Sequence, residues 1–133
     1  MNGNKIVSHK DLIVWQKAVE LAVIIYGLTE HYPKSEMYGL TSQSRRASVS
    51  IPSNIAEGRR RNTRNDFRHF LTISFGSGAE LETQIEIVKR LPFGKYIDFS
   101  KAEALLNEVM RMLNTMIINL QTGGLPYKLP ATS

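Results

Sequence analysis

The organisation of the chain is clearest in residues 38–71, which read YGLTSQSRRASVSIPSNIAEGRRRNTRNDFRHFL. Apolar residues recur at helical spacing in the first half of this stretch, at Leu40, Ala47, Ile51 and Ile55. Gly58 is a natural stop for that helix, and a short basic connection follows. A polar residue beyond it can cap the next helix, the candidates being Asn62, Thr63 and Asn65. The stretch therefore predicts a hairpin of two helices.

Pro52 lies inside the first of these helices, which we expect over roughly residues 38–57. Proline cannot donate to the carbonyl of Ser48, and its ring crowds that turn. We expect a kink rather than a break, because the hydroxyl of Ser48 or Ser50 can satisfy the freed groups.

A helix is also expected on each side of the hairpin. The region from Leu12 to Tyr32 is apolar at helical spacing over more than one face, and Pro33 ends it. A last helix is expected from about Ser100 to the glycine pair at 123–124. Four helices with short connections and no alternating strand pattern predict an all-α fold, an antiparallel up-down-up-down four-helix bundle with a kinked second helix.

Two glycines interrupt the third helix, which we expect to reach about Leu91. A glycine costs about 1 kcal/mol relative to alanine in a helix interior. Gly76 and Gly78 therefore suggest that another helix approaches closely at that level.

The length of 133 residues suits one domain with one core. We expect a flexible N-terminal lead over residues 1–8, the bundle over 9–122 and a flexible C-terminal tail over 123–133. Hydrophobic residues make up 42% and charged residues 22%, which is ordinary for a globular protein and argues against a disordered chain.

Several classes of protein and site are not supported by the sequence. There is no cysteine, so disulfides and thiolate metal sites are excluded. Asp11, Lys17 and Glu20 interrupt the first apolar stretch, which is not a signal peptide, and no segment reaches the roughly 20 apolar residues of a membrane span. A Walker loop, an HExxH pair and a Glu-x-x-His ligand pair are also absent. We expect a cytoplasmic protein without a cofactor or metal.

The net charge of +5 is concentrated in one window. Residues 40–69 hold seven arginines, two acidic residues and no lysine, whereas the rest of the chain has ten basic and ten acidic residues. A patch of this kind attracts polyanions, and the planar guanidinium suits phosphate better than an ammonium group does. We predict a nucleic-acid-binding site formed by Arg45, Arg59, Arg60, Arg61, Arg64 and Arg68.

The arginines also have a purely structural interpretation. They can cover apolar surface or pair with carboxylates such as Glu57, Glu80 and Glu82. Arg59, Arg60 and Arg61 are consecutive, however, so one neighbouring element cannot supply partners for all three. Sequence-specific readout is not expected, because no helix-turn-helix, zinc finger or RNA-stacking signature is present.

One motif points to catalysis instead. Arg64 and His69 resemble the Arg-x(4–6)-His motif of helical HEPN ribonucleases, in which the histidine would act as general acid or base. The motif is short enough to occur by chance in a basic segment. The glutamates 80, 82 and 86 are better interpreted as a solvated face than as an acid–base set. We predict that the protein is not an enzyme.

Several stretches together resemble the bacterial four-helix-bundle family named after the open reading frames in 23S rRNA intervening sequences. The resemblance runs in order over residues 9–120, and residues 50–58, SIPSNIAEG, are its most specific part. The other matching pieces are residues 11–18, 38–43, 46–47, 66–67, 70–71 and 76–81.

The resemblance implies a ring-like homopentamer. An assembly of this kind would be similar to the accessory protein of diversity-generating retroelements, whose basic surface engages nucleic acid and a reverse transcriptase. The family pattern also has recurring polar positions, which imply an internal hydrogen-bonded network or a subunit seam rather than a catalytic site. In this chain those positions are Arg46, Asn54, Glu57 and Glu80.

Three functions follow as hypotheses. The first is a non-enzymatic oligomer that binds RNA or DNA through phosphate contacts, with RNA preferred. The second is a structural scaffold for a protein partner, which would bind through the spare apolar stripe of the first or last helix and the proline-containing tail. The third is a HEPN-like ribonuclease, whose activity would be lost when His69 is replaced by alanine.

Overall fold

The computed structural model describes residues 8–121, and that part of the chain is helical without a strand. Its four long helices are α1 Ile13–Thr29, α2 Ser42–Arg59, α3 Arg64–Arg90 and α4 Ser100–Gln121. The short helical turns are η1 His9–Asp11, η2 Lys34–Glu36, η3 Met37–Thr41 and η4 Pro92–Tyr96. The predicted all-α class with four helices is confirmed. Except for Ser8, the predicted lead and tail lie outside the described residues.

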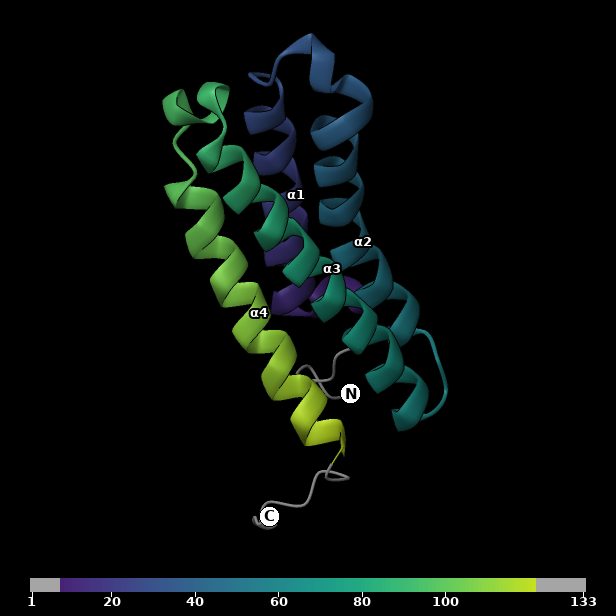
Figure 1. The fold of residues 1–133 in the computed structure, drawn as a ribbon. Helices are drawn as coiled ribbons and strands as arrows, with labels where there is room; N and C mark the ends of the chain where they lie inside the picture. The colour runs from purple at the N-terminus through teal and green to yellow at the C-terminus, as the bar shows by residue number, and fades with distance from the viewer. Residues whose placement is uncertain (1–7, 122–133) are drawn as a thin grey trace.

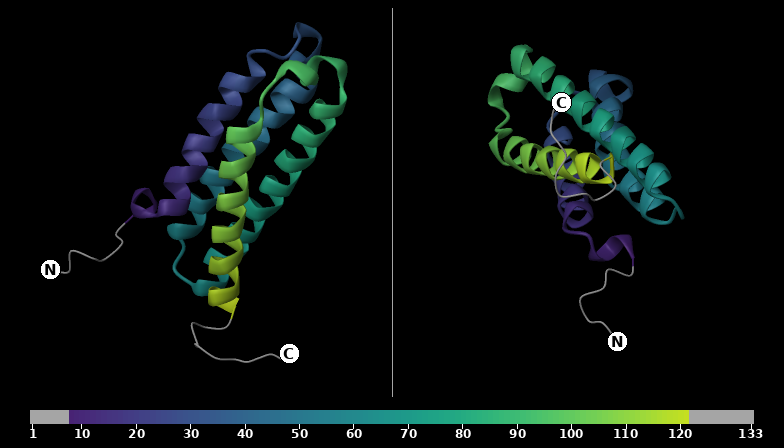
Figure 2. Two further views of the ribbon diagram at one scale, coloured as in Figure 1. Left: turned by 90° about the vertical axis from the view of Figure 1, so that its left-hand side faces the viewer. Right: turned by 90° about the horizontal axis from the view of Figure 1, so that it is seen from below.

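Each long helix packs against the next one in the chain, and α4 packs against α1. Figure 1 shows the α1–α2 and α3–α4 connections at one end of the bundle and the α2–α3 connection at the other. Figure 2 shows the start of α1 and the end of α4 toward this second end. The basic connection between α2 and α3 therefore lies at one end of the bundle.

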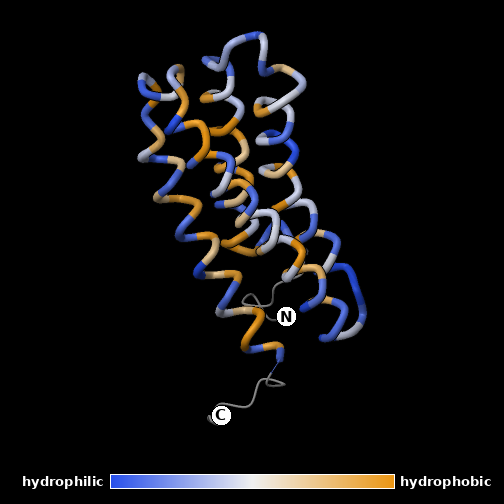
Figure 3. Tube along the Cα trace, viewed as in Figure 1, coloured by the Kyte–Doolittle hydropathy of each residue, from blue (hydrophilic) through white to orange (hydrophobic). Residues whose placement is uncertain are grey.

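The core takes side chains from all four helices. Leu21, Ile51, Leu81 and Leu106 are each at most 1% exposed, and burying one such side chain contributes about 1.5–3 kcal/mol. Figure 3 shows apolar segments on all four helices and a strongly hydrophilic α2–α3 connection. Burial therefore fixes the helix faces and leaves this connection to solvent.

The start of α2 differs from the prediction. We expected a helix from about Tyr38, whereas α2 begins at Ser42 after the π-helical turn η3. Gly39 has φ −112° and ψ −114°, which is not helical, and the carboxylate of Glu36 accepts a hydrogen bond from the N–H of Leu40 at 3.1 Å. The helix proper therefore starts only after this local cap.

The prediction that Gly58 stops α2 is wrong, because the helix continues to Arg59. Gly58 is buried where α2 meets α3. A Cβ atom at this position would lie 2.8 Å from Cβ of Phe70 and 3.2 Å from the carbonyl oxygen of Phe67. The glycine therefore permits a close approach of two helices rather than ending one.

Pro52 is buried within α2, which runs unbroken from Ser42 to Arg59. The hydroxyl of Ser48 donates to the carbonyl of Arg45 at 2.8 Å. The predicted kink stays a prediction.

Thr63, one of the three residues predicted as a possible cap, is the N-cap of α3. Its hydroxyl accepts a hydrogen bond from the N–H of Asp66 at 3.1 Å. Of the two glycines in α3, Gly78 faces α4, and a Cβ there would collide with Sδ of the flexible Met110 side chain; no backbone atom of α4 is among the nearest contacts. The close approach predicted at Gly76 is wrong, because that position is exposed and a Cβ would meet no atom within 4 Å.

Candidate nucleic-acid interface

The α2–α3 connection brings five of the six predicted arginines together. Arg59 is the last residue of α2, Arg60 and Arg61 follow it, and Arg64 opens α3. Arg68 lies one turn further along α3, on the same face as Arg64, because residues four apart are neighbours on a helix surface. We call this set, Arg59, Arg60, Arg61, Arg64 and Arg68, the arginine turn.

Two members of the arginine turn are engaged within the protein. Arg61 pairs with Glu57 at 2.7 Å, and its guanidinium lies 4.7 Å from the ring centroid of Phe70. The ion pair is half-exposed and spans one helical turn, a type that contributes only about 0.3–0.5 kcal/mol. Arg59 is half-buried and also has a partner. Both side chains are therefore engaged within the protein, although the pair between Glu57 and Arg61 is weak.

The other three members have no ion pair within residues 8–121. Arg60 and Arg64 are exposed, and Arg68 is partly buried. No carboxylate of the described residues lies within ion-pair distance of these three guanidinium groups. Asp66 is the nearest acidic residue in sequence, and it lies in the first turn of α3, where a negative charge favours the helix.

Arg45 does not belong to this surface. It precedes Arg59 by fourteen residues, which is about 21 Å along a helix. Its guanidinium donates to the hydroxyl of Thr29 at 2.8 Å and pairs with Glu30 at 3.3 Å, and it lies 4.6 Å from the ring centroid of Tyr26. Arg45 therefore ties α2 to α1. No local spacing could indicate this, because the partners lie 15 or more residues away in sequence.

The four recurring polar positions do not form one network in the described chain. Asn54 donates to the carbonyl of Ser50 at 2.9 Å and to its hydroxyl at 3.0 Å, while Glu57 pairs with Arg61. Arg46 and Glu80 instead line one surface hollow of about 510 Å³.

Serines that the sequence reasoning missed join α2 to α3. The hydroxyls of Ser50 and Ser77 share a hydrogen bond of 2.8 Å, and Ser74 donates to the carbonyl of Ile51 at 2.8 Å. The sequence signal that could have indicated these contacts is the spacing of the serines at positions 74 and 77, which places both on the buried face of α3. These bonds hold the hairpin that presents the arginine turn.

The two residues of the ribonuclease motif lie on different sides of α3. Five residues correspond to a rotation of about 140° and a rise of about 7.5 Å along a helix. His69 is exposed, and its ring contacts that of Phe70 with centroids 5.3 Å apart. The helix does not bring Arg64 and His69 to one face within a subunit.

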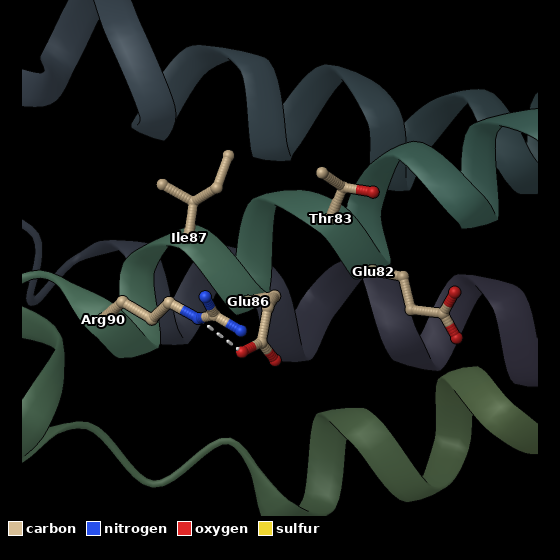
Figure 4. A pocket seen from close by; sticks show the side chains of 5 residues that line it. All are labelled: Glu82, Thr83, Glu86, Ile87 and Arg90. Atoms are coloured by element: carbon tan, nitrogen blue, oxygen red, sulfur yellow. Dashed lines mark hydrogen bonds and ion pairs between the residues drawn. The ribbon is translucent and has the colours of Figure 1, made fainter.

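The carboxylates on the outer side of α3 are solvated, as expected. Figure 4 shows Glu82 and Glu86 beside Thr83, Ile87 and Arg90, around a shallow hollow of about 450 Å³. Glu86 accepts a hydrogen bond from Nε of Arg90 at 2.9 Å. Within residues 8–121 there is no group of three His, Asp or Glu side chains that could hold a metal ion. In the same part of the chain, no helix has the length and apolar character needed to cross a membrane.

The groups with shifted pKa values lie outside the arginine turn. Burial raises the pKa of Tyr32 to about 12. A hydrogen bond to Glu103, at 2.9 Å, raises the pKa of Lys89. The backbone N–H of Ser100, which donates to Asp98 at 2.9 Å, is the main cause of a lowered pKa of that carboxyl. These contacts stabilise the fold and take no part in the arginine turn.

Comparison with known proteins identifies the family of this chain. A profile described as 23S rRNA-intervening sequence protein matches residues 10–115. A crystal structure from Bacteroides thetaiotaomicron, of a protein with unknown function from the S23 ribosomal protein family, is 28% identical with a TM-score of 0.67. The match covers 79% of this chain and 98% of that one. No curated protein matches. The chain belongs to the 23S rRNA-intervening sequence protein family.

Proposed function

We propose that the protein is a non-enzymatic, cytoplasmic oligomer that binds nucleic acid, RNA in preference to DNA, through phosphate contacts of the arginine turn. In this proposal the helices run up, down, up and down, with α2 bent at Pro52. The subunits form a ring-like homopentamer, as the family resemblance implies. A protein partner can add specificity.

One observation carries the proposal: three arginines at the α2–α3 end have no ion pair within the described chain. Arg60, Arg64 and Arg68 stand beside Arg61, whose bond to Glu57 is weak and exchangeable. Guanidinium groups form paired hydrogen bonds to phosphate oxygens, so this cluster suits a nucleic-acid backbone. The rest of the chain is electrically balanced, which makes the turn the natural site for a polyanion.

Oligomerisation would strengthen such a site. A few phosphate contacts per subunit bind weakly, but subunits that hold the same RNA molecule act together, and their effective affinity can rise by 10² to 10⁴. The surface carries no sequence-reading motif, so shape and charge are expected to dominate recognition.

The test is fluorescence anisotropy of a labelled RNA hairpin and a matched DNA duplex over a salt series. The variant replaces Arg60, Arg64 and Arg68 by alanine, because these side chains make no ion pair in the described structure. Each lost phosphate contact flattens the plot of log K against log salt by about 0.7 on single strands and 0.9 on duplex DNA. Three lost contacts per subunit therefore reduce the slope by about 2 to 3 for each subunit that contacts the nucleic acid.

A matched control removes the same charge elsewhere. Lys34, Lys95 and Lys101 are exposed and lie away from the arginine turn, so their triple alanine variant also loses three positive charges. The control is expected to bind with nearly the wild-type slope. Equal weakening by both variants would mean that only net charge matters, and a wild type that binds neither ligand at low salt would refute the proposal.

A structural scaffold for a protein partner is the second candidate. Exposed apolar side chains on α1 and in η3 favour it, among them Val23, which is 66% exposed, and Tyr38, which is 94% exposed. Exposed apolar surface is typical of sites that bind another protein. This candidate predicts partner binding that survives high salt.

A further inference from the structure

A second surface lies at the opposite end of α2 from the arginine turn. It is a hollow of about 590 Å³ formed where the end of α1, η3 and the start of α2 meet. Its apolar walls include Tyr26, Met37, Tyr38 and Val49, which are 44%, 49%, 94% and 41% exposed. Aromatic residues, methionine and arginine are the types enriched at protein interfaces. We call this surface the tyrosine hollow.

Arg46 lines the tyrosine hollow and gives it a positive charge. It is exposed and has no ion pair within residues 8–121, unlike Arg45 beside it, which is held by Glu30. An occupant that complements the hollow would combine an apolar group with a nearby carboxylate.

The outer face of α3 offers this combination. Ile87 is 44% exposed, and Figure 4 shows it with Thr83 along one side of the helix, next to the carboxylates of Glu82 and Glu86. Glu82 is exposed and has no ion pair in the described chain. We call this surface the α3 face, defined by Glu82, Thr83, Glu86 and Ile87.

We propose that the tyrosine hollow of one subunit receives the α3 face of a second copy of this chain, with Arg46 opposite Glu82. The inference rests on the proposed oligomeric function and names the interface that would build it. Apolar side chains meet at the centre, and opposite charges meet at the rim, which is the usual anatomy of a specific interface.

The two surfaces are different patches of one chain. A head-to-tail contact between them repeats around a closed ring or along an open filament, whereas a two-fold contact that pairs each patch with the other stops at a dimer. Both lie toward the end of the bundle that holds the α1–α2 and α3–α4 connections. A contact between patches at the same level needs little translation along the bundle axis, which favours closure.

The test is sedimentation velocity of the full chain without nucleic acid. The wild type is expected to sediment as an oligomer well above the 15.0 kDa monomer. Arg46→Glu and Val49→Asp are each expected to raise the concentration needed for assembly at least tenfold. Lys101→Glu on α4 makes the same charge change as Arg46→Glu at an exposed position away from both surfaces, and it should assemble as the wild type does.

A charge swap makes the test specific. Arg46→Glu combined with Glu82→Arg restores the pair with reversed signs, so assembly should recover in the double variant. Circular dichroism checks that each variant remains helical. A monomeric wild type, full assembly of both hollow variants, or a double variant as dissociated as Arg46→Glu would each overturn the inference. Because nucleic acid is absent, the outcome is independent of whether the arginine turn binds RNA.

Discussion

Replacing Gly58 by alanine is expected to destabilise the protein, although alanine is the better helix former. Gly58 lies inside α2 and is buried against α3. A Cβ there would lie 2.8 Å from Cβ of Phe70, which is fixed to the α3 backbone, and 3.2 Å from the carbonyl oxygen of Phe67. A rotamer change cannot relieve either contact, so the two helices must move apart.

The magnitude follows from two opposing terms. Alanine gains at most about 1 kcal/mol of helix propensity over glycine. Overpacking at a tight contact costs about 1–3 kcal/mol. We therefore expect a net loss of roughly 1 kcal/mol, which corresponds to a melting temperature lower by about 4 °C for a domain of this size.

Thermal unfolding followed by circular dichroism measures this change, at one fixed protein concentration because an oligomer melts in a concentration-dependent way. Gly76→Ala is the matched control. It lies in a helix as well, but it is exposed and a Cβ would meet nothing within 4 Å, so it should be stabilised by up to about 1 kcal/mol. A Gly58→Ala protein stabilised to the same degree as Gly76→Ala would refute the close contact.

Three further changes separate structure from function. Arg45→Ala removes the tie between α2 and α1 and should cost about 1–2 kcal/mol in thermal unfolding, while RNA affinity stays within twofold of wild type. Asp98→Ala should lower the melting temperature at neutral pH. Hydrogen bonding to Ser100 lowers the pKa of Asp98, so the charged carboxylate stabilises the folded protein at any pH above the usual pKa of 3.8. This stabilisation is lost as the pH falls through the lowered pKa of the folded protein. In a pH series the melting temperatures of Asp98→Ala and the wild type should therefore converge in acid. His69→Ala and the wild type should both leave a labelled RNA intact over hours on a gel, whereas cleavage by the wild type alone would support the ribonuclease.

Much of the fold could be predicted from the sequence because its signals are local. Helical periodicity, the prolines and the Thr63 cap act over a few residues, and the described residues form four long helices close to the expected ranges. The errors occurred where tertiary contact overrides local preference. Glycine is a residue type that often ends a helix, but Gly58 is needed inside α2 because Phe70 of α3 packs directly against it. The late start of α2 likewise depends on Glu36, whose carboxylate caps Leu40.

The candidate site could be predicted only as a set of charges. Composition located the arginine-rich window, and the i,i+4 spacing of Glu57 and Arg61 made their ion pair foreseeable. The contacts of Arg45 with Thr29 and Glu30 could not be foreseen, since only the folded chain brings α1 beside α2. The roles of the predicted arginines therefore separate only in three dimensions.

The central claim is that the arginine turn binds a nucleic-acid backbone. It is tested most directly by the salt dependence of RNA-hairpin binding for the wild type and the variant with alanine at Arg60, Arg64 and Arg68. The account predicts tight binding at low salt by the wild type, and in the variant a slope flatter by about 2 to 3 for each subunit that contacts the RNA. Identical affinity and slope for the two proteins, or no binding by an intact wild-type oligomer, would contradict it.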